Sequence, residues 1–139
     1  MTINYWAILA AAVASFVFGG IWYGALSKPW LAALGKTEAE LKSNARPMPL
    51  LFGITIVAQL IMAWVFAGLM LHLVKAGIAA SASNGKISAA FCWLGYVATT
   101  LAVNHGYQGA RSMLTLIDGA HWLGVLLIQG LIIGWFGIR

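Results

Sequence analysis

Four long apolar runs dominate the chain and leave few ways in which it can fold. A helix needs about 20 residues to cross the roughly 30 Å of hydrocarbon in a bilayer, and each run reaches that length. The strands of a membrane barrel are about 10 residues long and alternate apolar with polar side chains, which these runs do not. The pattern predicts an all-α membrane protein, one domain of residues 1–139 with a compact bundle of four transmembrane helices over about 3–26, 50–74, 87–107 and 113–138.

Composition agrees with a lipid bilayer as the partner of this chain. Hydrophobic residues make up 62% of it and charged residues only 8%, against roughly a quarter charged in a soluble domain. The net charge of +5 raises the question of nucleic acid, but the Lys and Arg residues are scattered over short loops and form no basic face. Cys92, the only cysteine, lies inside the third run. We therefore expect no nucleic-acid partner, no disulfide and no thiolate metal site.

The only long connection, Ser27 to Pro49, follows the first helix. Within it Thr37 and Glu40 have the spacing of a capping box, which predicts a short helix beginning there. The apolar side chains of the connection could form the underside of an amphipathic segment on the bilayer surface. A plain polar connector is the alternative. The side chains concerned are Trp30, Leu31, Leu34 and Leu41.

Orientation follows from the distribution of positive charge. The first and third loops hold Lys28, Lys36, Lys42, Arg46 and Arg111, whereas the other side holds Lys75, Lys86 and Arg139. Positive residues collect in cytoplasmic loops. We expect both termini to lie outside the cytoplasm.

Most polar side chains in apolar surroundings fall between Ala98 and Gln129. At 100° per residue, Thr100 and Asn104 lie on one stripe of the third helix. Asp118, His121 and Gln129 share a face of the fourth, at spacings of three to eight residues. Because the third helix ends where the fourth begins, the sequence predicts that Asn104, Asp118 and His121 meet. Arg111 is the expected charge partner of Asp118, because an acid within a membrane normally has one.

Two glutamines lie near the middle of their helices, Gln59 in the second and Gln129 in the fourth. A hydrogen bond between them across the helix pair would contribute roughly 0.6 to 2 kcal/mol in a membrane. We expect this pair to be structural.

Small residues recur along the first and last helices, as is typical of faces where two helix backbones approach closely. Sixteen glycines in so short a chain favour such contacts, within the bundle or between copies. The predicted packing positions are Gly19, Gly20, Gly24, Gly130 and Gly134.

The polar cluster has several interpretations. It could lock the turn between the third and fourth helices, in a non-catalytic structural or assembly protein. It could instead pass a small polar solute or protons through a transporter or channel-like subunit, because Asp and His take part in proton relays. An enzyme or metal protein using His105 with Asp118 and His121 is the third, but no nucleophile motif, phosphate loop or converging ligand set is present. We favour an oligomeric transporter or channel-like subunit without a cofactor or metal, with the structural role as the alternative, and expect no enzyme.

Three segments carry a resemblance to a known family: Gly-x-x-Trp-Tyr at Gly19–Tyr23, the segment Trp30–Gly35, and Gly109-x-Arg111 with Ile117-Asp118 before the fourth helix. With these the chain resembles, over nearly its whole length, the small, mostly bacterial four-span membrane proteins of domain-of-unknown-function family 1761. The resemblance implies an integral protein of a bacterial inner membrane. It carries over no activity, substrate or catalytic residue.

Overall fold

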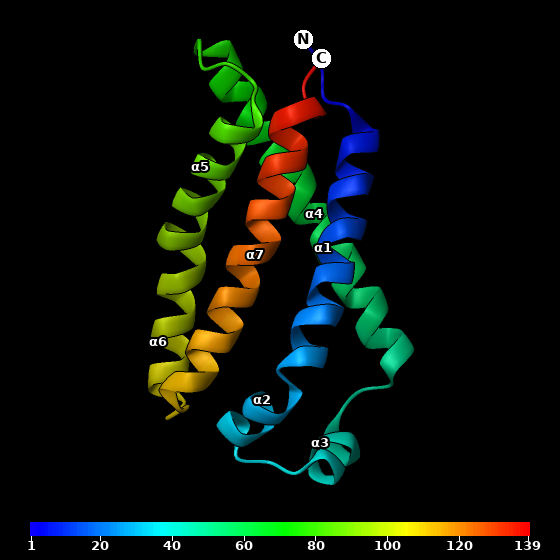
Figure 1. Ribbon diagram of the computed structural model, residues 1–139, viewed down its shortest axis with the longest axis vertical. Coiled ribbons are helices and arrows are strands. Elements are labelled where there is room, and N and C mark those ends of the chain that lie inside the picture. Colours follow the sequence, from blue (N-terminus) through cyan, green and yellow to red (C-terminus); the bar gives the residue numbers. More distant parts are fainter.

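The computed structural model describes residues 1–139 and is helical almost throughout, with four helices long and apolar enough to cross a membrane. Figure 1 shows them as a compact bundle, with both termini at one end and the short helices α2 and α3 at the other. The predicted fold class is confirmed. The spans are α1 (Tyr5–Ala25), α4 (Met48–Lys75), the continuous helix made of α5 (Ala82–Cys92), η1 (Trp93–Ala98) and α6 (Thr99–Tyr107), and α7 (Ser112–Phe136).

Helix α7 is the central element of the bundle. It lies between the third span and α1, with α4 behind it (Figure 1), and it has more buried residues than any other helix. Its closest neighbour is α5. Gly130 and Gly134 lie against the backbone of Gly85, and a Cβ atom on Gly130 would stand 2.5 Å from the Gly85 carbonyl oxygen. This small-residue face therefore packs inside one chain and is not available to a second copy.

The third span begins five residues earlier than the sequence predicts. Asn84-Gly85 is typical of a turn, but Ser81 caps a helix there by accepting a hydrogen bond from the Asn84 N–H at 3.1 Å. Gly85 is needed in this helix because no larger residue fits against Gly130. Helix packing thus overrides the local turn preference.

Two of the predicted packing glycines do not pack. A Cβ atom on Gly20 or Gly24 would meet nothing within 4 Å, so these glycines mark open space beside α1. Gly19 alone of the three contacts another helix, because its missing side chain makes room for the ring of His121, whose Nε2 would lie 2.9 Å from a Cβ atom there. The i, i+4 spacing predicted helix contacts at all three glycines of α1, but only Gly19 lies on the face that contacts another helix.

The buried core lies in the half of the bundle nearest the termini. There Ile8 and Ala11 of α1 pack with four residues of α4, Ala89 of α5, and Leu126 and Ile133 of α7. The chain ends are joined above it: the Asn4 N–H donates to the Gly137 carbonyl at 2.8 Å, and the Asn4 amide donates to the Phe136 carbonyl at 3.0 Å. The α4 residues are Ala63, Phe66, Ala67 and Met70.

The connection after α1 forms two short helices, α2 (Ser27–Leu34) and α3 (Glu38–Asn44). Gly35, with φ of 68°, ends α2 in the left-handed conformation that favours glycine. The predicted capping box begins α3: the Glu40 N–H donates to the Thr37 hydroxyl at 3.2 Å, and the Thr37 N–H donates to the Glu40 carboxylate at 2.7 Å. Helix α2 also contacts α7, so it closes the bundle from below.

Candidate functional site

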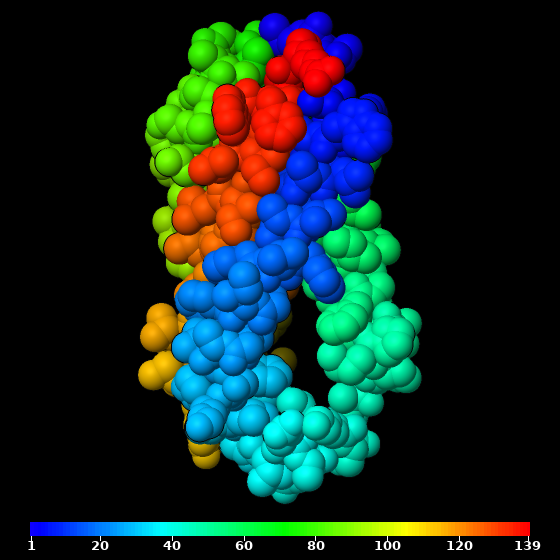
Figure 2. Space-filling model, turned by 45° about the vertical axis from the view of Figure 1, so that its right-hand side comes forward, coloured from blue at the N-terminus to red at the C-terminus, as the bar shows by residue number.

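A crevice of about 520 Å³ lies between α1, α4 and α7, in the half of the bundle away from the termini. It exists because α4 has no buried side chain before Gln59, so its first turns stand apart from the other helices. Figure 2 shows the surface hollowed here, between the second half of α1 and the beginning of α4. The lining combines aromatic rings with a few polar groups: Phe16, Gly19, Gly20, Tyr23, Phe52, Ile54, Thr55, Ala58, Gln59, His121 and Trp122.

His121 lies at the back of this crevice. Its side chain is only 5% exposed and is surrounded by rings: Phe18 stacks on it at 6.0 Å between centroids, and Tyr23 lies at 4.8 Å. Its Nδ1 atom is buried and has no hydrogen-bond partner in the chain. A buried polar atom without a partner is costly, so a histidine held in this way is a candidate for binding a molecule from the crevice.

Asp118 is held by α1. The Tyr23 hydroxyl donates a hydrogen bond of 2.7 Å to Asp118 Oδ1, and the Trp22 indole N–H donates to the neighbouring Ile117 carbonyl at 3.2 Å. Below them Trp30 of α2 meets the Tyr23 ring edge-on at 5.5 Å, and its indole nitrogen is buried without a partner. Tyr23 therefore connects the carboxylate of α7 to the wall of the crevice.

The two glutamines meet as predicted, although through the backbone. The Gln129 amide donates to the Gln59 carbonyl oxygen of the main chain at 3.3 Å. Both side chains are fully buried, at 0% and 1% exposure, and the Oε1 atom of each has no partner. Gln59 is also one of the residues that line the crevice.

The predicted pairing of Arg111 with Asp118 is wrong. The Arg111 guanidinium donates instead to the Ala32 carbonyl in the last turn of α2, beside Gly35. The only salt bridge in the chain joins Lys42 to Glu38. The carbonyl end of a helix attracts a cation, and Arg111, which precedes the first turn of α7, lies nearer to that end than to Asp118.

Asn104 and Thr100 do not join the cluster either. Both are exposed, and the Thr100 hydroxyl donates to the Tyr96 carbonyl of its own helix. His105 faces α7 instead, with Nδ1 at 2.9 Å from Thr115 Oγ1. The prediction assumed 100° per residue, but the span contains the π-helical segment η1, whose wider turns change the phase of the residues that follow.

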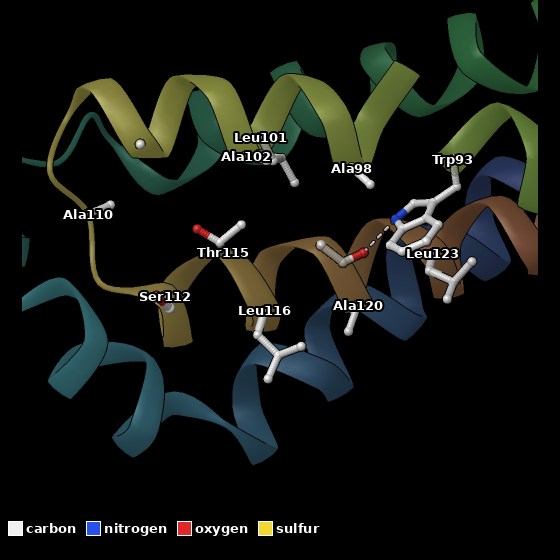
Figure 3. Close-up of a pocket in the computed structure, with 12 residues that line it drawn as sticks. Trp93, Ala98, Leu101, Ala102, Ala110, Ser112, Thr115, Leu116, Ala120 and Leu123 are labelled. Carbon is white, nitrogen blue, oxygen red and sulfur yellow. Dashed lines mark hydrogen bonds between the residues drawn. The ribbon is translucent and has the colours of Figure 1, made fainter. Parts of the chain in front are cut away.

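A second pocket of about 640 Å³ lies between the third span and α7 (Figure 3). Alanine and leucine side chains form most of its wall, and the Trp93 indole N–H crosses it to donate to the Gly119 carbonyl at 2.8 Å. The polar residues predicted for this helix pair are absent from its lining. His121 lies on the opposite side of α7, so His105, Asp118 and His121 do not converge.

The sequence did not indicate Tyr23 or Trp30 as site residues. The aromatic pair Trp22-Tyr23 is typical of an interfacial belt, which explains the ring positions but not the hydrogen bonds to α7. A signal was nevertheless present, because Tyr23 and Asp118 occupy the same end of antiparallel spans and Asp118 needs a partner.

The fold defines a four-span integral membrane protein with a crevice, lined by aromatic rings and a few polar groups, in the half of the bundle away from its termini. The chain belongs to the family described as protein of unknown function DUF1761, whose sequence model matches residues 6–134. No curated protein and no solved structure matched the chain.

Proposed function

We propose that this protein is a non-enzymatic transporter or channel-like subunit that passes a small polar solute or protons through the crevice between α1, α4 and α7. One observation carries the proposal: His121 Nδ1 and Gln59 Oε1 are buried, lack a partner in the chain and belong to residues that line this crevice. An unsatisfied buried polar atom costs about 1 to 3 kcal/mol. A solute that pairs with these atoms would recover that free energy at a position inside the bilayer.

The site differs from the one that the sequence favoured. Of the predicted cluster, His121 and Gln59 line the crevice, together with Tyr23. Asp118 and Gln129 are hydrogen-bonded to Tyr23 and Gln59, whereas Asn104, Thr100 and Arg111 lie outside the site. Its polar groups come from three helices, so a movement of α4 relative to α1 and α7 would open or close it. Gating by movement of packed helices is a common device in transporters.

We also propose a homo-oligomer in a bacterial inner membrane, with both termini outside the cytoplasm. Four helices enclose no continuous pore, and the crevice is open at its side (Figure 2), so a second copy would be needed to complete a path. The end with α2 and α3 holds five Lys and Arg residues against three at the other end, which favours a cytoplasmic position for the former.

Flux measurements on reconstituted vesicles test the proposal. Gly20 lines the crevice and has open space beside it, so Gly20→Leu should fill the crevice without disturbing the fold. Gly24→Leu is the matched control, because Gly24 has the same open space one turn further along α1 and does not line the crevice. Proton flux under a potential and osmotic uptake of small polar solutes should fall with the first variant only. Vesicles of the parent protein with no flux above empty vesicles contradict the transport role.

A non-catalytic structural or assembly role is the second candidate. The observation that favours it is the bond between Tyr23 and Asp118, which ties α1 to α7 and needs no solute. Under this alternative, Asp118→Asn changes the stability of the protein and the parent protein shows no flux.

A further inference from the structure

We infer that the crevice binds an organic cation with an apolar or aromatic body, such as a substituted ammonium ion. The inference rests on the proposed function in its choice of site, and it names the chemical class of the solute. Charge, ring placement and the unpartnered acceptor atoms support it independently of one another.

The charge around the crevice favours a cation. Asp118 is the only carboxylate in the four membrane spans; it does not itself line the crevice, but it accepts a hydrogen bond from Tyr23, which does. None of the eleven lining residues is Lys or Arg. The nearest arginine in sequence, Arg111, donates to the Ala32 carbonyl and forms no salt bridge with Asp118. A cation buried without a partner is costly. Asp118 offers a positive solute a negative charge as its partner, and no other residue of the spans does.

The rings of the crevice point to the same class. Phe16 of α1 and Phe52 of α4 meet edge-on at 5.7 Å across it, and Tyr23 and Trp122 complete an aromatic wall. Aromatic faces attract cations, and quaternary ammonium groups are recognised by such cages. Donation of the Tyr23 hydroxyl to Asp118 increases the electron density of the phenol, which strengthens this attraction.

Polar acceptors supply the remaining contacts. Gln59 Oε1 lacks a donor, and Thr55 lies one turn before it on the same wall. A primary or secondary ammonium could donate to Gln59 while its body rests on Phe52. A solute of this kind reaches the site from the lipid side, because the α4 wall of the crevice carries exposed apolar side chains, among them Phe52 and Ile54.

Binding to the full chain in phosphatidylcholine nanodiscs tests the inference by equilibrium dialysis, with empty nanodiscs subtracted. Three probes share a benzene ring and differ in charge: benzyltrimethylammonium, benzyl alcohol and benzenesulfonate. The cation should bind at least tenfold more tightly than the other two. Asp118→Asn, which keeps an acceptor for Tyr23, should weaken cation binding about tenfold through loss of charge, and Phe52→Leu about fivefold through loss of one cation–π contact.

Matched variants identify nonspecific effects. Glu38→Gln removes a carboxylate from α3, and Phe91→Leu removes an exposed ring from the third span; neither residue lines the crevice, so both should leave binding unchanged. If Asp118→Asn does not fold, Phe52→Leu decides, because Phe52 is 52% exposed and its loss leaves the core intact.

Three results overturn the inference: no cation binding at millimolar concentration, equal binding of benzenesulfonate, or unchanged binding in the folded variants of Asp118 and Phe52. The flux assay separates this failure from that of the proposed function. Cation binding without any flux removes the transport role and leaves the ligand class intact. Flux that Gly20→Leu blocks, in a protein that does not bind the cation, removes the ligand class alone.

Discussion

The hydroxyl of Tyr23 and the carboxylate of Asp118, 95 residues apart in the chain, form a hydrogen bond of 2.7 Å between the last turn of α1 and the second turn of α7. Arg111, the expected partner of this acid, is bound to α2 instead. The bond therefore contributes to joining the first and last spans and holds the only carboxylate of the spans against α1.

Tyr23→Phe should lower the free energy of unfolding by about 1 to 2 kcal/mol, the size of a good interhelical hydrogen bond in a membrane. A double-mutant cycle with Asp118→Ala should show a coupling of similar size, because either change removes the same bond. Arg111→Gln should be additive with Asp118→Ala, since the two side chains do not touch. Unfolding in mixed micelles with increasing dodecyl sulfate measures the free energy of unfolding of the three single and two double variants. Strong coupling of Arg111 with Asp118 is the result that contradicts this account.

Gly130→Ala should destabilise the bundle by more than 1 kcal/mol, because even a methyl group would collide with the Gly85 backbone. Gly68→Ala is the matched control in a neighbouring span, where a Cβ atom would meet nothing within 4 Å, and it should leave the thermal midpoint in detergent unchanged or slightly higher. A Gly130→Ala variant that keeps its stability and changes only its mass in detergent would place this face between copies rather than within one chain.

The positive charge bias predicts the topology that we propose. A reporter active only outside the cytoplasm should be active when fused after Arg139 and silent when placed near Lys42. Adding two lysines after Asn4 should lower the activity of the Arg139 fusion, because the bias is only five to three. The reverse activities would invert the orientation and leave the four-span architecture in place.

The capping box makes the order of α3 depend on pH. Donation from the Thr37 N–H lowers the pKa of the Glu40 carboxyl, with a smaller effect of the Thr37 hydroxyl. A carboxyl whose pKa is lower in the folded state stabilises that state above its ordinary pKa and loses this contribution as pH falls through the folded value. Hydrogen exchange measures this effect. The protection factors of the amides in the first turn of α3, which are corrected for intrinsic exchange rates, should therefore decrease at acid pH.

The matching control for this pH effect concerns Glu38, whose pKa is lowered by the hydrogen bond and the charge of Lys42. Glu38→Gln should keep the acid-dependent loss of protection at the beginning of α3, whereas Glu40→Gln should remove it. If both variants retain the full dependence, the Glu40 carboxylate does not hold the cap.

The number and approximate positions of the four spans and the α3 cap could be predicted from the sequence because each depends on neighbouring residues alone. A run of about 20 apolar residues meets the thickness of a bilayer wherever it occurs, and Thr37 reaches Glu40 within a single turn. The mid-membrane meeting of Gln59 and Gln129 was also predictable, because both glutamines lie near the middle of their spans and therefore at a similar depth in the bundle.

Tertiary packing decided the rest. The π-helical segment η1 turned Asn104 outward, the carbonyl end of α2 took Arg111, and contact with Gly130 drew Gly85 into a helix although its sequence favours a turn. The crevice follows from the separation of α4 from α1, and no pattern within α4 records that separation. Which face of an apolar helix meets its neighbours depends on how all the helices fit together, because the surrounding lipid is as apolar as the core and leaves no amphipathic pattern to read.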